Sequence, residues 1–274
     1  VSLTQAVSLA DVLRLEPAGP DAGGDEIVCA GVEGPNLAAE ALAAYRRASG
    51  WGAPPQRLTI DKHVPVAAGM GGGSSDAAAT LRLAAAAAGQ PADPLLEELA
   101  SQLGSDVPSL LRPGLVLVGG TGEEVRLLPA LAPYWLLMLP LGARLSTADV
   151  FAEADRLGLA RPAHELAARR AAIEAAVSEG KEPPLELLDN DLEPAARSLC
   201  PAIDGALAAA RDAGADRALV TGSGPTVVGV FRDRSRPVPR IADELRPRFP
   251  RACAADPLAP RHGEPMPARP LPRL

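Results

Sequence analysis

The stretch PVAAGMGGGSS, residues 65–75, most restricts the folds open to this chain, because glycine occupies four of the five positions from 69 to 73. Glycine adopts backbone angles closed to other residues and lets main-chain N–H groups approach an anion without a Cβ in the way. The preceding RLTIDKHVPV alternates like a strand, and the following DAAATLRLAAAAAG favours a helix from near Asp76 to Gly89. We therefore predict a strand, a glycine loop and a helix in succession.

A glycine loop in this position is a candidate phosphate site. The unpaired N–H groups and positive dipole end of a helix N-terminus attract a phosphate group. Two adjacent hydroxyls, Ser74 and Ser75, can bind a phosphate oxygen. The alternative is a flexible turn before an ordinary helix, and the flanking strand and helix favour phosphate binding. The candidate residues are Pro65, Val66, Ala67, Ala68, Gly69, Met70, Gly71, Gly72, Gly73, Ser74 and Ser75.

Two familiar phosphate-binding loops do not match. The loop has no lysine followed by serine or threonine, so it differs from the P-loop of NTPases. A dinucleotide-binding loop is followed after about twenty residues by an acidic residue at a strand end. Glu97 has roughly that spacing but lies in a predicted helix, so the dinucleotide reading is weak.

Composition excludes several other functions. The formal net charge is -7 and the basic residues are scattered, which argues against binding to nucleic acid or an anionic membrane. No apolar run is long enough to span a bilayer, so we expect a cytoplasmic protein. The cysteines, Cys29, Cys200 and Cys253, are far apart without CxxC spacing, which predicts free thiols and no zinc site.

We predict two domains, 1–131 and 132–257, and a Pro/Arg-rich tail, 258–274. In the first, residues 1–30 suggest two antiparallel strands about a turn at 18–25, and Asn36 is a candidate N-cap. Further expected elements are a helix at 95–103, a hairpin at 114–129, a strand from Tyr134, helices near 147–157, 163–179, 192–198, 202–213 and 237–248, and two strands within 215–231. The second domain is thus predicted to be a two-layer α/β sandwich.

Three more motifs contain polar residues of interest. Asp106, in GSDVP, is a carboxylate between a helix end and a proline, which suits either a general base or an ordinary turn residue. Gly222, Ser223 and Gly224, in TGSGP, suit a hairpin turn between two strands. Asn190 or Asp191, in NDLEP, can cap the helix that follows, and no ligand contact is assigned to this segment.

Taken together, these motifs resemble the GHMP kinases, the superfamily of galactokinase, homoserine kinase, mevalonate kinase and phosphomevalonate kinase. PVAAGMGGGSSDAAATL is similar to the second signature of the superfamily. With LGSDVPSLL, LSTADVF, NDLEPAARSLCPAI and TGSGPTVVGVF, it resembles in order the kinases that phosphorylate 4-diphosphocytidyl-2-C-methyl-D-erythritol in the non-mevalonate isoprenoid pathway.

The resemblance implies an α+β, two-domain GHMP kinase fold, each domain a β-sheet packed by helices, with the active site in the interdomain cleft. It implies ATP and Mg²⁺ as cofactors, a cytidine diphosphate-linked alcohol as substrate, and a monomer or weak dimer. Residues 65–75 would hold the ATP phosphates, and Asp106 would take the proton from the 2-hydroxyl of the substrate. Gly222, Ser223 and Gly224 would form the loop that closes over the phosphates and substrate.

The sequence departs from the family pattern at its start. An Ala-Lys-Asn-like strand and an Asp-Gly-Tyr-His turn, which supply a catalytic lysine and a cytosine-stacking aromatic in the family, do not precede Val1. Lys62 belongs to a different strand and is not expected to replace that lysine. The alternatives are therefore a truncated or degenerate relative that binds nucleotide without turnover, or another GHMP kinase such as homoserine kinase.

Overall fold

The computed structural model describes residues 1–32, 34–90, 94–178 and 181–259. Its first elements are β1 (Ser2–Gln5), β2 (Val12–Pro17), β3 (Glu26–Cys29), α1 (Leu37–Ser49), β4 (Gln56–Asp61), α2 (Gly72–Ala87), α3 (Leu95–Leu103), α4 (Val107–Leu110), β5 (Leu115–Gly119) and β6 (Glu124–Leu128). There follow β7 (Trp135–Leu139), α5 (Thr147–Leu157), α6 (Ala163–Ser178), the 3₁₀ helix η1 (Leu185–Leu187), α7 (Glu193–Leu199), α8 (Ala202–Asp212), β8 (Arg217–Val220), β9 (Val227–Phe231), α9 (Val238–Leu245) and β10 (Cys253–Ala255).

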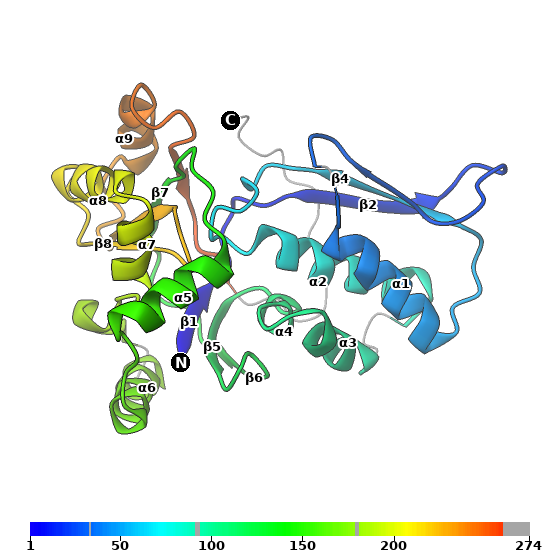
Figure 1. Cartoon of the computed structure of the whole chain (residues 1–274), viewed down its shortest axis with the longest axis horizontal. Helices are drawn as coiled ribbons and strands as arrows, with labels where there is room; N and C mark the ends of the chain where they lie inside the picture. Colours follow the sequence, from blue (N-terminus) through cyan, green and yellow to red (C-terminus); the bar gives the residue numbers. More distant parts are fainter. Residues whose placement is uncertain (33, 91–93, 179–180, 260–274) are drawn as a thin grey trace.

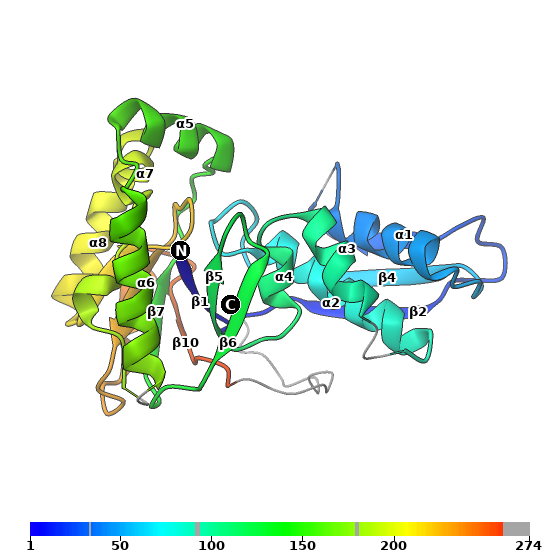
Figure 2. The same cartoon turned by 90° about the horizontal axis from the view of Figure 1, so that it is seen from below.

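The elements form two groups along the long axis of the molecule. Figure 1 shows α1 to α4 with β2 and β4 at one end, and α5 and α7 to α9 with β7 and β8 at the other. The strands β1, β5 and β6 lie between these groups (Figure 2). The sheets have the orders β2-β4-β3, β1-β5-β6 and β10-β7-β9-β8.

The first sheet corrects our prediction for residues 1–30. The strands on either side of the turn at 18–25 do not pair, because β4 lies between them, antiparallel to β2 and parallel to β3. Of the three strands, β4 carries the most deeply buried side chains, with Leu58 at 0% and Ile60 at 2% exposure. A strand with such an apolar face is stabilised most in the central position, because the neighbouring strands and the covering helices remove its side chains from water.

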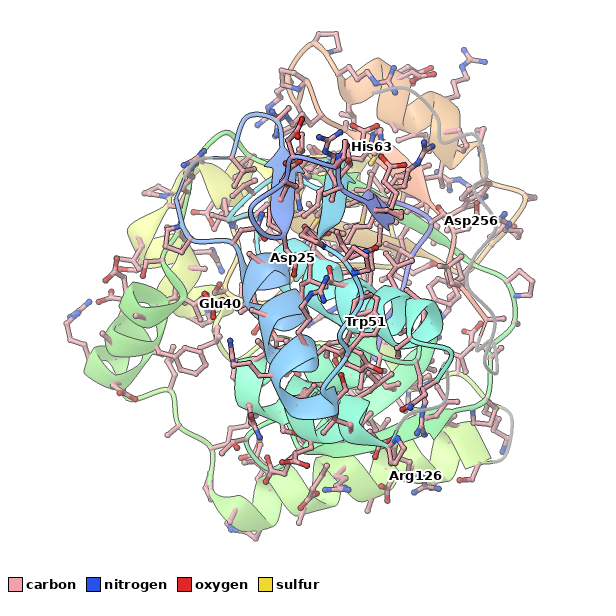
Figure 3. The ribbon with its side chains drawn as sticks, turned by 90° about the vertical axis from the view of Figure 1, so that its right-hand side faces the viewer. Asp25, Glu40, Trp51, His63, Arg126 and Asp256 are labelled. Atoms are coloured by element: carbon pink, nitrogen blue, oxygen red, sulfur yellow. The ribbon has the colours of Figure 1, made fainter. Side chains whose placement is uncertain are left out.

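Helices α1 and α2 cover one face of this sheet. Asn36 caps α1 as predicted, since its Oδ1 accepts the N–H of Ala38 at 2.9 Å. Arg46, near the end of α1, bonds to Asp25 at 2.6 Å and lies over the ring of Trp51, both labelled in Figure 3. The helix is thereby tied to the chain before β3 and the chain before β4.

The second sheet connects the two groups of elements. Its β5–β6 pair is the hairpin expected at 114–129. Ile173 and Val177 of α6 pack on Leu115, Leu117 and Leu128 of this hairpin. Arg126 of β6 lies beside α6 in Figure 3, with Nη1 3.2 Å from Glu174 Oε1. A helix from the second half of the chain thus covers a sheet from the first half.

The third sheet has a helical layer on one face. Residues of α5, α7, α8 and α9 form a core with Leu137, Leu139, Val220, Val227 and Phe231. The helices and strands expected between 134 and 248 are present with small shifts at their ends. The short strand β10 was not predicted, because its three residues carry no strand pattern and depend on pairing with β7.

The opposite face of the third sheet meets the start of the chain. Val7 forms a β-bridge with Pro257, and the N–H of Ser8 donates to Asp256 O at 2.8 Å. Asp256 is labelled in Figure 3. Most of the expected Pro/Arg-rich tail, residues 260–274, lies outside the described residues.

The expected α+β fold, with separate sheets packed by helices, is therefore confirmed. The division into 1–131 and 132–257 stays a prediction. All three cysteines have free thiols. In the described part of the chain, no helix has the length and apolar character required to cross a membrane.

Leu81 offers a test of the α1–α2 core. Its side chain is fully buried in α2, so Leu81→Ala should lower the free energy of unfolding by about 2–5 kcal/mol through lost burial and a cavity. Leu199, 42% exposed, is the matched control, and Leu199→Ala should change that free energy by less than about 0.5 kcal/mol. Urea unfolding measures both, and equal losses would contradict this assignment of the core.

Candidate nucleotide site formed by two glycine loops

The predicted phosphate loop lies between β4 and α2, as expected, but α2 begins four residues earlier than Asp76. Gly71 adopts φ 65° and ψ 19°, a left-handed conformation that turns the chain into the helix. The N–H of Ser75 then donates to Gly71 O at 2.8 Å. Residues 72–75 are therefore the first turn of α2, because helical hydrogen bonding overrides the low helix propensity of two glycines.

The N-terminus of α2 fits a phosphate group. No side chain caps this helix, and no acidic residue occupies its first turn. A Cβ on Gly73 would meet no atom within 4 Å, so the surface at this turn is open. Uncapped N–H groups at an open helix end need an external acceptor, which water or an anion can supply. These residues can therefore hold the phosphates of a nucleotide.

The second glycine loop, residues 221–225, packs directly on the first. A Cβ on Gly69 would lie 2.6 Å from both Gly224 O and Thr221 O, and Gly69 itself has φ 71°. A Cβ on Gly222 would lie 2.8 Å from Gly69 O. The structure thus brings together two loops that the sequence placed about 150 residues apart, and backbone lies against backbone where they meet.

Neighbouring residues of the phosphate loop also contact the third sheet. The N–H of Thr226 donates to Ala68 O at 3.4 Å. Met70 packs against Leu136, Met138 and Val228 on the face of the sheet opposite its helices. The loop is therefore held by both groups of elements.

The NDLEP segment holds the second loop, a role that our sequence analysis missed. Asn190 Nδ2 donates to Val220 O at 2.8 Å and to Gly222 O at 2.7 Å. Its Oδ1 accepts the N–H of Leu192 at 3.0 Å, which is the local capping contact we had considered. Glu193 Oε2 accepts the N–H of Val220 at 3.0 Å. The sequence clue to this role was the side-chain amide of Asn190. An asparagine can accept a hydrogen bond from a nearby N–H and at the same time donate one to a distant carbonyl.

A pair of hydroxyl groups joins α5 to the second loop. Ser223, 9% exposed, lies 3.0 Å from Thr147 through the two Oγ atoms. Thr147 is the first residue of α5, which Ser146 caps. The LSTADVF motif therefore reaches the second glycine loop, a contact that the sequence could not reveal.

Asp106 precedes α4, a short helix packed against α2. Its side chain is exposed, while its main-chain oxygen accepts the Ser109 hydroxyl at 2.8 Å. Arg82 of α2 donates to Leu110 O at 2.7 Å and so ties the end of α4 to the helix of the phosphate loop. Burial lowers the pKa of this arginine. An exposed carboxylate on an anchored turn is available to a substrate hydroxyl.

Lys62 lies between two carboxylates, Asp11 and Asp76, both missed from sequence. The signal was present: Lys62 shares the strand alternation of the buried residues Leu58 and Ile60, and a lysine on a buried face needs a carboxylate partner. Its ammonium group is thus already paired.

No protein-only metal site occurs in the described ranges. They contain no group of three or more His, Cys, Asp or Glu side chains able to hold a metal ion.

Known protein families match both halves of the chain. The GHMP kinase N-terminal domain matches residues 36–114, and the GHMP kinase C-terminal domain matches residues 169–250. A homoserine kinase from Cytophaga hutchinsonii has the same fold, with TM-score 0.70 and 18% identity over 95% of this chain and 90% of that one. The fold is that of a GHMP kinase.

Proteins with higher sequence identity to this chain define its family within the GHMP kinases. The 4-diphosphocytidyl-2-C-methyl-D-erythritol kinase of Streptomyces coelicolor is 41% identical over 247 residues, covering 88% of this chain and 79% of the relative. A crystal structure of 4-(cytidine 5'-diphospho)-2C-methyl-D-erythritol kinase has TM-score 0.72 and 32% identity, covering 93% and 88% of the two chains. The chain belongs to this family of GHMP kinases.

Two glycines provide a matched test of the loop contact. Gly69→Ala would push a methyl group into Gly224 O and Thr221 O at a left-handed φ, so it should lower the free energy of unfolding by about 1–3 kcal/mol. Gly73→Ala places its methyl in open space in a helix and should raise that free energy by about 0.5–1 kcal/mol. Thermal and urea unfolding measure both variants. An unchanged or higher free energy of unfolding for Gly69→Ala would argue against the loop packing.

Proposed function

We propose that this protein is an ATP-dependent kinase that phosphorylates the 2-hydroxyl of 4-diphosphocytidyl-2-C-methyl-D-erythritol, a step of the non-mevalonate isoprenoid pathway. The observation that carries the proposal is the direct packing of the two glycine loops beside an uncapped helix N-terminus. The 41% identity to a kinase named for this substrate supports the choice of alcohol. The homoserine kinase shares only 18% identity and therefore supports the fold alone.

The mechanism follows from what these residues can do. The N–H groups at the start of α2 hold phosphate oxygens, and the helix dipole stabilises their negative charge. Bound Mg²⁺ would neutralise part of the developing charge on the transferred phosphoryl group. Because such transfer depends mainly on positioning, the rigid contact between Gly69 and the second loop serves to keep the phosphates in line.

Asp106 is our candidate for the group that accepts the proton of the alcohol. Its carboxylate is exposed, and α4 is anchored to α2 through Arg82. General base catalysis requires that the base lie within hydrogen-bonding reach of the attacking hydroxyl, and a carboxylate can serve as that base. We propose that Gly222, Ser223 and Gly224 contact the phosphates and substrate. Asn190 holds their loop in place by donating a hydrogen bond to Gly222 O.

Substrate-dependent ADP release tests the proposed function. The chain with MgATP should release ADP when 4-diphosphocytidyl-2-C-methyl-D-erythritol is added and only at background rate without it. Homoserine serves as the competing alcohol, and preference for homoserine would replace the proposed substrate. ATP binding without turnover on either alcohol would indicate a relative that binds nucleotide without catalysis.

Asp106→Asn tests the proposed base. The amide keeps the size of the side chain but cannot take a proton, so kcat should fall by about 10²- to 10⁴-fold while ATP affinity is retained. Asp212→Asn, at the end of α8, is a control for the loss of one carboxylate away from the loops. Steady-state ADP release and ATP titration separate the two effects, and undiminished turnover of Asp106→Asn would remove Asp106 from the mechanism.

A further inference from the structure

Three charged side chains form a buried network beneath the first turn of α2. Lys62 Nζ donates to Asp11 Oδ2 at 2.5 Å and to Asp76 Oδ2 at 2.8 Å. The exposed fractions of the side chains are 13% for Lys62, 2% for Asp11 and 6% for Asp76. Two carboxylates thus share one ammonium group, and the ionised network has one excess negative charge.

The two carboxylates are not equally satisfied. Asp11 Oδ1 accepts the main-chain N–H groups of His63 at 2.6 Å and Val64 at 2.8 Å. Asp76 Oδ1 is buried without any hydrogen-bond partner. A buried, unpaired carboxylate oxygen is costly when ionised. Asp76 is therefore the member of the network that gains most from taking up a proton.

The excess charge lies close to the proposed phosphates. Asp76 is the fifth residue of α2, about 6 Å along the helix axis from Gly72. Lys62 Nζ is 3.5 Å from the position that a Cβ on Gly72 would take. A polyanion at this helix end would repel the ionised network through a low-dielectric interior.

We propose that Asp76 takes up a proton when a nucleoside triphosphate binds at the start of α2, so that the Asp11–Lys62–Asp76 network is a proton-linked positioning element of the phosphate loop. The inference rests on the proposed nucleotide-binding function. The proton comes from solvent and converts the carboxylate of Asp76 to a carboxylic acid, and no bond of the nucleotide changes. The neutralised network then holds the end of β4 to α2 without repelling the phosphates.

The electrostatic surroundings of Asp76 agree with this role. Burial raises the pKa of Asp76 to about 6, the hydrogen bond from Lys62 opposes the rise, and the charge of Asp11 adds to it. The thiol of Cys29 on β3 also lies near the network, and its own pKa is raised, chiefly by burial. Bound phosphates would raise the pKa of Asp76 further, toward neutral pH.

The same group links stability to pH in the free protein. The pKa of Asp76 in the folded state, about 6, exceeds its ordinary value of 3.8. The folded state therefore binds more protons than the unfolded state between about pH 4 and 6, and stability falls as pH rises through that window. Asp76→Asn should remove this contribution and flatten the dependence of the melting temperature on pH.

Isothermal titration calorimetry with MgATP, and no alcohol, tests the proposal directly. Titrations at pH 7 in HEPES and in Tris, which differ in ionisation enthalpy, give the number of protons taken up. The wild type should take up a fraction of a proton more than Asp76→Asn, and this difference removes the proton exchange of the nucleotide itself. At pH 8 the variant should bind MgATP roughly three- to tenfold more tightly, and the two affinities should converge near pH 5.5.

Two further variants sharpen the test. Asp61→Asn removes an equal charge next to Lys62, but the Asp61 side chain is 72% exposed, so proton uptake and affinity should match the wild type. Asp11→Asn leaves one carboxylate for Lys62, lowers the proton affinity of Asp76 and should also abolish the excess uptake. It provides the same readout if Asp76→Asn does not fold.

The outcomes separate this inference from the proposed function. Equal proton uptake by the wild type and the network variants, with MgATP bound, would overturn the inference and leave the kinase proposal in place. No MgATP binding by any of the proteins would overturn both, because the phosphate loop would then be misassigned. Excess uptake by the wild type without turnover on the alcohol would support the inference and contradict the proposed kinase activity.

Discussion

The direct contact between Gly69 and the loop 221–225 is the constraint on which the candidate site depends. Main-chain atoms of two loops from different halves of the chain meet where a single Cβ would lie only 2.6 Å from the opposite backbone. Side chains can change rotamer to absorb an error in position, whereas backbone in contact with backbone cannot. The contact therefore sets the distance between the start of α2 and the third sheet. Asn190 and Thr147 hold the second loop in turn, so the helices behind it share the same constraint.

In the proposed site, the groups that would attract phosphate are main-chain N–H groups rather than basic side chains. Its net charge is -7, and the lysine closest to the loop is neutralised by two carboxylates. Arg82 is likewise used internally, because it donates to the main-chain oxygens of Leu110, the last residue of α4, and of Leu111. What the phosphate loop offers an anion is an uncapped helix end, which binds through aligned N–H groups and brings no net charge. Such a site is sensitive to buried charge beneath it, which makes the ionisation of Asp76 consequential.

Local patterns were sufficient for most of the elements. The strand, glycine loop and helix around residue 70, the helix at 95–103 and the hairpin before residue 129 follow from alternation, helix propensity and glycine positions. The errors in our predictions were of a different kind. The pairing of β4 between β2 and β3 and the strand β10 depend on partners distant in sequence. The early start of α2 is a local effect of helical hydrogen bonding, since the N–H of Ser75 donates to Gly71 O. Asn190 and Asp76 escaped notice because their own neighbourhoods have ordinary capping and helical interpretations.

By itself, the sequence determined that the chain has a glycine loop before a helix, a second glycine turn in its last third, and the motif order of a GHMP kinase. These depend on the torsional freedom of glycine and on side-chain periodicity, which are properties of short segments. Only the tertiary structure decided that the two loops touch, that an asparagine between them in sequence braces the second, and that Lys62 is buried between two carboxylates. The physical reason is that contact, burial and pKa are set by atoms that folding brings together, and no local pattern encodes which distant atoms those are.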